Sequence, residues 1–365
     1  MAVAELAQTG TPATIDEYLR KRLMPVEGAI PHLAGIDMYG STIPAESVGG
    51  DIYEYINFQQ RYNIEERITR AQQLSKIFLV PLGKGMKPRH EVDIASKWFM
   101  SRLGYSDASI LEYLKVKSSE QLRIAENLRE LSKTAGVLLV DGQGHGIIAA
   151  KIASTVHDTL HAFMMAELDR SGAITPIVFE QLNLRLAHSA TARNALGQGA
   201  DACSREIATM LYGEIRSGGQ FRFVNFGHPP PLVFSAKYNR FMEIGKARIA
   251  QFPALGLEIP ADHPDRNKYI PLKLRKNQMV SSDMAEITLM GRGDILFLHT
   301  DGIFDGSSEQ DRRQIESLIQ EHKHQAAKEI CNAVLDYSIN SDDVLRASGR
   351  VDEIDDKTVF VIKRS

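Results

Sequence analysis

An apolar run that ends in an aspartate and a glycine-rich turn constrains the fold of this chain more than any other stretch. Residues 137–146 read VLLVDGQGHG, which predicts a buried strand with Asp141 at its carboxyl end. The three glycines of the turn allow left-handed backbone conformations and close approach to a neighbour. Apolar residues at helical spacing follow over 147–168, so a helix should begin just after the turn, with its first amides directed at the carboxylate. Taken alone, the pattern also fits an ordinary strand-to-helix turn with a surface aspartate.

The same combination recurs at three other places. DILFLHTDG is again an apolar strand that leads to Asp301 and a glycine. SVGGDIYEY places Asp51 after two glycines at the start of an alternating strand, and EIDDKTVFVIKR sets Asp355 just before the last strand. With no cysteine or histidine at ligand spacing, such carboxylates indicate a site for hard cations such as Mg²⁺ or Mn²⁺ rather than zinc.

Bulk composition is that of an ordinary globular protein. Of 365 residues, 43% are hydrophobic and 24% charged, and the length allows about two domains. A net charge of −3 without a basic block indicates neither nucleic acid nor an anionic membrane as partner. No apolar run reaches the roughly 20 residues that span a bilayer, and the first residues lack a signal-peptide layout. With only Cys203 and Cys331 present, we expect a reducing compartment, the cytoplasm.

The order of predicted elements indicates an α+β fold. Strands, two helices, more strands, two helices and a last strand do not fit a parallel βαβ array, but they suit antiparallel sheets covered by helices. Residues 1–13 read as a disordered tail. A helical block at 59–134 separates two strands, so it is interpreted as an inserted subdomain, with a purely structural role as the alternative. Within it, Ser118 and Gln121 predict a capping box that starts a helix.

Five motifs in a fixed order resemble the metal-dependent protein phosphatases of type 2C. They are AESVGGDIYEY, VDGQGHGIIAAKIAS, FVNFGHPPPLVF, LHTDGIFDG and DDKTVFVI. Within that family they resemble the bacterial branch typified by the stage II sporulation protein E phosphatase and the sigma-B regulatory phosphatases. The resemblance implies a four-layer α-β-β-α sandwich of two antiparallel sheets flanked by helices. This domain would span residues 14–365 and be interrupted by the block at 59–134.

The resemblance also implies ligands for two Mn²⁺ or Mg²⁺ ions, residue by residue. Asp51 and Asp141 match the carboxylates shared between the ions, and Gly142 matches a glycine that ligates through its carbonyl oxygen. Asp301 and Asp355 match the two remaining acidic ligands. The same four aspartates are the predicted catalytic residues.

Further residues of the motifs have weaker assignments. Asp356 and Thr358 match accessory positions of the closing motif. His145 is included among the catalytic residues because it could protonate a leaving alkoxide, with a structural hydrogen bond as the alternative. His228 is expected to hold its hairpin, and His299 to lie in the core or beside the ligands.

The implied function is that of a phosphoprotein phosphatase, a phosphoric monoester hydrolase. A metal-bridged hydroxide would hydrolyse phosphoserine or phosphothreonine, since two divalent ions lower the pKa of a bridging water and neutralise the phosphate. The resemblance implies a phosphorylated protein partner in a bacterial partner-switching pathway, such as an anti-sigma-factor antagonist. The alternatives are a phosphatase-like module that binds a phosphoprotein with weak or no turnover, and a hydrolase of nucleotides or small phosphoesters.

Two departures from the branch pattern are visible. Family members usually join the first two acidic motifs by a short hairpin, whereas here the block 59–134 lies between Asp51 and Asp141. That block is therefore a hypothetical docking, signal-sensing or homodimer-forming element. Glu54 stands where an aspartate is common, and we expect this change to be tolerated.

Overall fold

The computed structural model describes part of the chain, and those residues form two compact units. The described residues are 30–79, 102, 104, 107–144, 146–195, 206–244, 251–257, 285–304, 309–351 and 354–365. The first unit contains those up to Asn57, Ala135–His161 and those from Phe179 onward, and the second contains those of Phe58–Thr134 and Ala162–Val178. The tail predicted at 1–13 lies outside the described residues.

The first unit contains two β-sheets. Their strands are β1 (Ile36–Ile43), β2 (Asp51–Ile56), β3 (Thr134–Gly142), β4 (Ala208–Arg216), β5 (Gln220–Phe226), β6 (Leu232–Ser235), β7 (Arg240–Met242), β8 (Gln251–Phe252), β9 (Ala285–Thr288), β10 (Ile295–His299) and β11 (Lys357–Arg364). Among the described residues, one sheet has the order β1-β11-β10-β6-β7 and the other β2-β3-β4-β5-β8, with β9 paired to β5. Neighbours in the first sheet run antiparallel, as do β2 with β3 and β4 with β5, whereas the short β8 runs parallel to β5.

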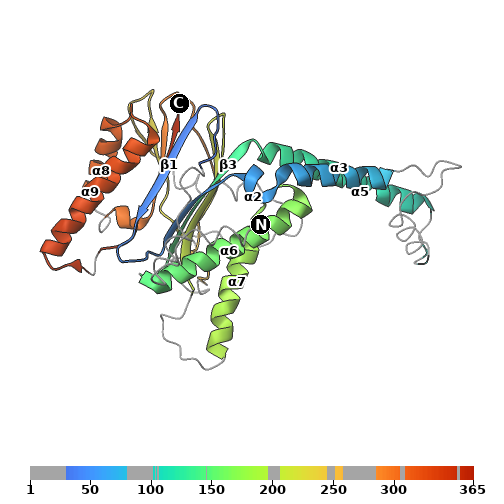
Figure 1. Ribbon diagram of the computed structural model, residues 1–365, viewed down its shortest axis with the longest axis horizontal. Helices are drawn as coiled ribbons and strands as arrows, with labels where there is room; N and C mark the ends of the chain where they lie inside the picture. Colours follow the sequence, from blue (N-terminus) through green and yellow to red (C-terminus); the bar gives the residue numbers. More distant parts are fainter. Residues whose placement is uncertain are drawn as a thin grey trace, which may run out of the picture. The chain divides into compact units, whose positions relative to one another are not determined.

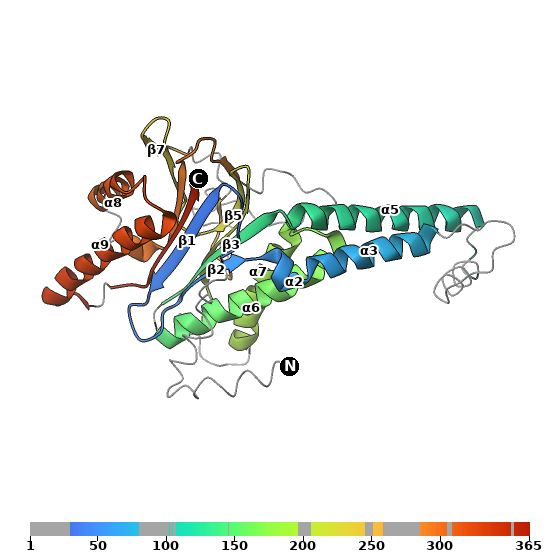
Figure 2. The same ribbon diagram turned by 45° about the horizontal axis from the view of Figure 1, so that its top comes forward.

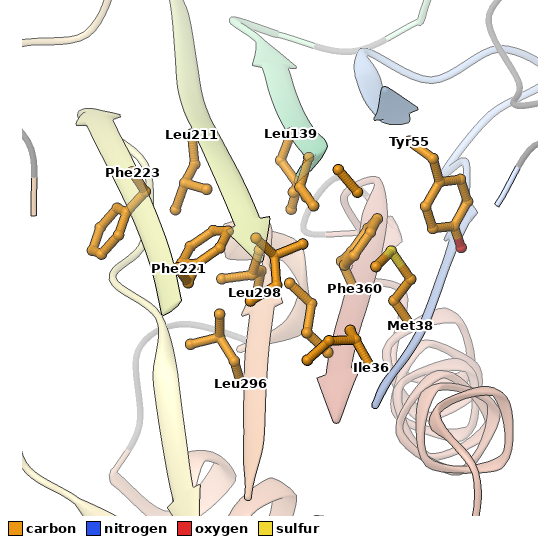
Figure 3. Close-up of a cluster of buried hydrophobic side chains, with 14 of the residues drawn as sticks. Ile36, Met38, Tyr55, Leu139, Leu211, Phe221, Phe223, Leu296, Leu298 and Phe360 are labelled. Carbon is orange, nitrogen blue, oxygen red and sulfur yellow. The ribbon is translucent and has the colours of Figure 1, made fainter. Parts of the chain in front are cut away.

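Alternation of side chains along the strands builds the core on both faces of the first sheet. Leu296 and Leu298 of β10 point into a cluster between the two sheets, together with Phe360 of β11 (Figure 3). Ile295 and Phe297, which alternate with these leucines, belong to a separate cluster on the opposite face. This period of two is what the runs ILFLH and TVFVI require of a strand buried on both sides.

Helices cover the outer faces of both sheets (Figure 1). On the first sheet, α8 (Glu309–Glu321) and α9 (Ala327–Ala347) contribute apolar residues to the outer cluster. The second sheet is faced by α6 (Gly146–Ser171) and α7 (Pro176–Ala195), and the Phe179 ring of α7 lies 5.3 Å from that of Tyr212 and 5.8 Å from that of Phe226. The predicted sandwich of two antiparallel sheets flanked by helices is therefore confirmed.

The second unit is helical. It contains α2 (Phe58–Tyr62), α3 (Ile64–Leu79), α5 (Asp107–Leu131) and the last residues of α6, and α3 and α5 lie side by side (Figure 2). The helix start predicted at Ser118 is wrong, because α5 already begins at Asp107 and the Ser118 hydroxyl donates to the carbonyl oxygen of Ser75 at 3.0 Å. A capping-box pattern does not end a helix whose preceding residues, DASILEYLKVK, contain no glycine or proline to break it. Within the described part of the chain, none of the helices is both long and apolar enough to cross a bilayer.

Candidate metal centre

Strands β2 and β3 place two carboxylates next to each other. Asp51 starts β2 and pairs in antiparallel register with Asp141, the penultimate residue of β3. The N–H of Gly142 donates to the carbonyl oxygen of Gly50 at 3.1 Å and continues this ladder beyond the pair. Residues directly opposite on antiparallel strands have Cβ atoms about 4.5–5.5 Å apart, so both carboxylates occupy one end of the ladder.

The other sheet supplies two more carboxylates. Asp301 begins the 3₁₀ turn Asp301–Ile303 two residues after β10, and Asp355 precedes the adjacent β11 by two residues. A Cβ at Gly302 would lie 3.2 Å from the Cβ of Asp355, so the segments that carry Asp301 and Asp355 are adjacent. Burial raises the pKa of Asp141, and repulsion from Asp51, Asp301 and Asp355 adds to this effect. The structure thus brings together the four carboxylates singled out in the sequence, two from each sheet.

Two threonines connect Asp51 to the opposite sheet. The hydroxyls of Thr300 and Thr358 each lie 2.7 Å from Asp51 Oδ2, to which they donate. The Thr358 N–H also donates to Thr300 Oγ1 at 2.9 Å. Burial raises the pKa of Asp51 to about 8, although the two hydroxyl hydrogen bonds act in the opposite direction. Asp51 is buried beside other carboxylates. The two hydroxyl hydrogen bonds alone do not offset the cost of a negative charge there.

The donor set fits a hard divalent cation. Burial, followed by repulsion from neighbouring aspartates, raises the pKa of Asp141 to about 9, and burial also raises the pKa of Asp355. A divalent cation reverses this effect because it favours the ionised form of each carboxylate. Oxygen ligands are the ones that Mg²⁺ and Mn²⁺ prefer.

The segments around the aspartates are fixed by close backbone contacts. Asp356 accepts hydrogen bonds from the N–H groups of Ala45, at 2.7 Å, and Gly50, so it holds the turn that leads into Asp51. A Cβ at Gly142 would overlap the carbonyl oxygen of Ala149, which explains why this position requires glycine. The roles of the Gly142 carbonyl as a ligand and of His145 as a general acid stay predictions, and His145 lies outside the described residues.

Comparison with known proteins agrees with the motifs. The sequence model of stage II sporulation protein E matches residues 132–275. The resemblance predicted from the motifs is confirmed for this segment. No curated protein is similar to the chain in sequence.

Solved structures similar to this chain include two bacterial examples. The RsbU and RsbW domains of Rv1364c from Mycobacterium tuberculosis are 15% identical, with a TM-score of 0.47 over 93% of this chain and 63% of that chain. The SiaA-PP2C domain of Pseudomonas aeruginosa is 13% identical, with a TM-score of 0.45 over 90% of this chain and 86% of that chain. The chain thus spans less than two thirds of the first of these structures.

Two histidines, His228 and His299, are buried beside the centre. Burial lowers the pKa of His228 to about 3 and that of His299 to about 4. His228 accepts a hydrogen bond at its carbonyl oxygen from the Asn225 side chain and donates its N–H to the same side chain, as expected of a residue that holds a hairpin. Its Nδ1 lies 2.8 Å from Thr209 Oγ1, which is 3.5 Å from Asp141 Oδ2.

A second cluster of potential ligands was not predicted from the sequence. Glu54 of β2 meets His157 and His161 of α6, so the expectation that no histidine has ligand spacing is wrong. The signal was present in HDTLH, where two histidines four residues apart in a predicted helix must share one face. Burial raises the pKa of Glu54, but hydrogen bonds with both histidines outweigh it and lower the pKa to about 2.

Proposed function

We propose that this chain is a metal-dependent phosphatase that hydrolyses phosphoserine or phosphothreonine in proteins. The observation that carries the proposal is geometric. Asp51 pairs with Asp141 at one end of the second sheet, and Thr300 and Thr358, next to Asp301 and close to Asp355 in the first sheet, donate to Asp51. A divalent cation would favour the ionised form of these buried carboxylates. The stage II sporulation protein E match over residues 132–275 supports the same assignment.

In this proposal the four aspartates and the carbonyl oxygen of Gly142 hold two Mn²⁺ or Mg²⁺ ions. Bound divalent ions supply Lewis acidity, which activates water for attack and neutralises the phosphate group. Thr300 and Thr358 orient the Asp51 carboxylate through their hydroxyls. His145 donates a proton to the leaving oxygen of the serine or threonine.

The test is the Mn²⁺-dependent hydrolysis of a phosphoserine peptide and of p-nitrophenyl phosphate. Asp301→Asn should lower kcat at least ~100-fold, because loss of a ligand should exceed the 10–100-fold effect of losing an outer partner of a metal site. Asp336→Asn, which changes an exposed aspartate of α9, is the matched control and should keep full activity. Full Mn²⁺-dependent turnover by Asp301→Asn would refute the proposal.

The physiological partner in this proposal is a phosphorylated anti-sigma-factor antagonist in a bacterial partner-switching pathway. The support is the resemblance of the five motifs to the sporulation and sigma-B phosphatases. The segment 59–134 would act as the docking, sensing or dimer-forming element. Replacing segment 59–134 with a short linker should change the preference of the enzyme for the phosphoprotein over p-nitrophenyl phosphate. An unchanged preference would count against this role.

A further inference from the structure

Glu54, His157 and His161 converge on one point between β2 and α6. Glu54 Oε2 lies 2.6 Å from His161 Nε2 and 3.2 Å from His157 Nε2. One ligand atom of each residue lies within 4.8 Å of the other two. The two imidazole rings, one helical turn apart, have centroids 4.5 Å from each other. Three donor atoms from two different elements are therefore already assembled.

We propose that Glu54, His157 and His161 form a binding site for one Zn²⁺ ion, separate from the carboxylate centre. Two imidazoles and one carboxylate are a donor set that zinc uses when a fourth position stays open to water. Imidazole also favours zinc over Mg²⁺, which prefers oxygen ligands. Tetrahedral zinc with ligands at about 2.0–2.1 Å separates the ligand atoms by roughly 3.3 Å. The distance from Glu54 Oε2 to His157 Nε2 already matches this value. The distance from Glu54 Oε2 to His161 Nε2 would have to lengthen by roughly 0.7 Å to reach it.

An outer partner supports the ligand role of His157. Its Nδ1 lies 3.1 Å from Asp158 Oδ1, while its Nε2 is directed at Glu54. A carboxylate on the second ring nitrogen fixes the tautomer that leaves Nε2 available for a metal. The side chain of His161 is 9% exposed and that of His157 is 20% exposed, so the site is sheltered but reachable from the His157 side.

The cluster lies on the opposite face of β2 from the carboxylate centre. Side chains alternate along a strand, so Asp51 and Tyr55 share one face and Glu54 points to the other. Tyr55 belongs to the cluster between the two sheets, whereas Glu54 contacts α6 on the outer side. Three residues of strand add a separation of roughly 10 Å along the chain. A zinc ion here would link β2 to α6 without using any ligand of the carboxylate centre.

The test uses the full chain, stripped with a chelator and then kept in excess Mg²⁺ so that a hard cation occupies the carboxylate centre. Zn²⁺ is titrated in competition with a chromophoric chelator, and Co²⁺ replaces it for visible absorption. One Zn²⁺ should bind per chain and raise the thermal midpoint of the wild-type protein. His157→Gln and His161→Gln should each weaken zinc binding at least 10-fold, whereas exposed His324→Gln, the matched control, should leave it unchanged.

Other outcomes overturn the proposal. They are the absence of zinc binding to the wild-type chain in excess Mg²⁺, unchanged binding in folded His157→Gln, and loss of binding in Asp301→Asn. Circular dichroism shows whether each variant is folded, and the wild-type thermal shift needs no variant at all. Because zinc binding is measured without substrate, its failure is distinguishable from a failure of the phosphatase proposal.

Discussion

Replacing Asp141 with asparagine should stabilise the metal-free protein while removing a proposed metal ligand. Asp141 has a pKa raised from 3.8 to about 9, first by burial and then by repulsion from Asp51, Asp301 and Asp355. Among the described residues, the hydrogen-bond contact of its carboxylate is a long one, 3.5 Å between Asp141 Oδ2 and Thr209 Oγ1. Asparagine therefore removes the cost of keeping this carboxyl protonated and loses little hydrogen bonding.

The size of the effect follows from linkage. The folded chain holds the Asp141 proton more tightly than the unfolded chain, so wild-type stability is fully present below pH 3.8 and falls as the pH rises toward 9. At pH 7 a carboxyl with an ordinary pKa of 3.8 costs up to about 4 kcal/mol to keep protonated, and at pH 5 up to about 1.6 kcal/mol. Because Asp141 shares this cost with the neighbouring carboxylates, which titrate together with it, we expect Asp141→Asn to raise the free energy of unfolding by about 1–3 kcal/mol at pH 7.

The assay is urea unfolding followed by far-UV circular dichroism, in chelator, at pH 5 and pH 7. Asp141→Asn should have the higher midpoint at pH 7, and its advantage should shrink at pH 5. Excess Mn²⁺ should reverse the order, because a ligand at 100 times its Kd stabilises the native state by about 2.7 kcal/mol. Equal midpoints at pH 7 in chelator, or an advantage independent of pH, would refute this reasoning, and Asp336→Asn serves as the control.

Three further predictions concern a close backbone contact, a buried hydrogen bond and a buried thiol. Gly142→Ala should lower the free energy of unfolding by about 1–3 kcal/mol because its Cβ overlaps the Ala149 carbonyl, and an unchanged thermal midpoint would contradict this. Thr358→Val should lower the free energy of unfolding in urea by about 1–3 kcal/mol at pH 9, because Asp51 is ionised there and loses the hydrogen bond from the Thr358 hydroxyl. An equal loss at pH 5 would argue against that cause. Burial raises the pKa of Cys331 to about 12. In a Cys203→Ser background, a thiol reagent at pH 8 should therefore label Cys331 only when the chain unfolds. Rapid labelling of the native protein would contradict this prediction.

The sequence predicted those parts of the fold that depend on local pattern. Apolar runs that end in aspartate and glycine located the strand ends at Asp141 and Asp301, because a buried strand and a tight turn leave a strong signal over a few residues. The start of α5 was missed because a capping box is a weak signal where the preceding residues also favour a helix. The contact of Glu54 with the α6 histidines could not be predicted, since it depends on how a helix packs on a strand a hundred residues away.

The carboxylate centre depends on the pairing of the two sheets rather than on either sheet alone. Asp51 belongs to the second sheet, yet the hydroxyls that hold it, Thr300 and Thr358, come from the first. The apolar cluster between the sheets fixes the pairing register of β11 with β10. A shift of β11 by one residue would turn Phe360 out of that cluster and move Thr358 away from Asp51. The geometry of the carboxylate centre therefore depends on the same apolar burial that holds the two sheets together.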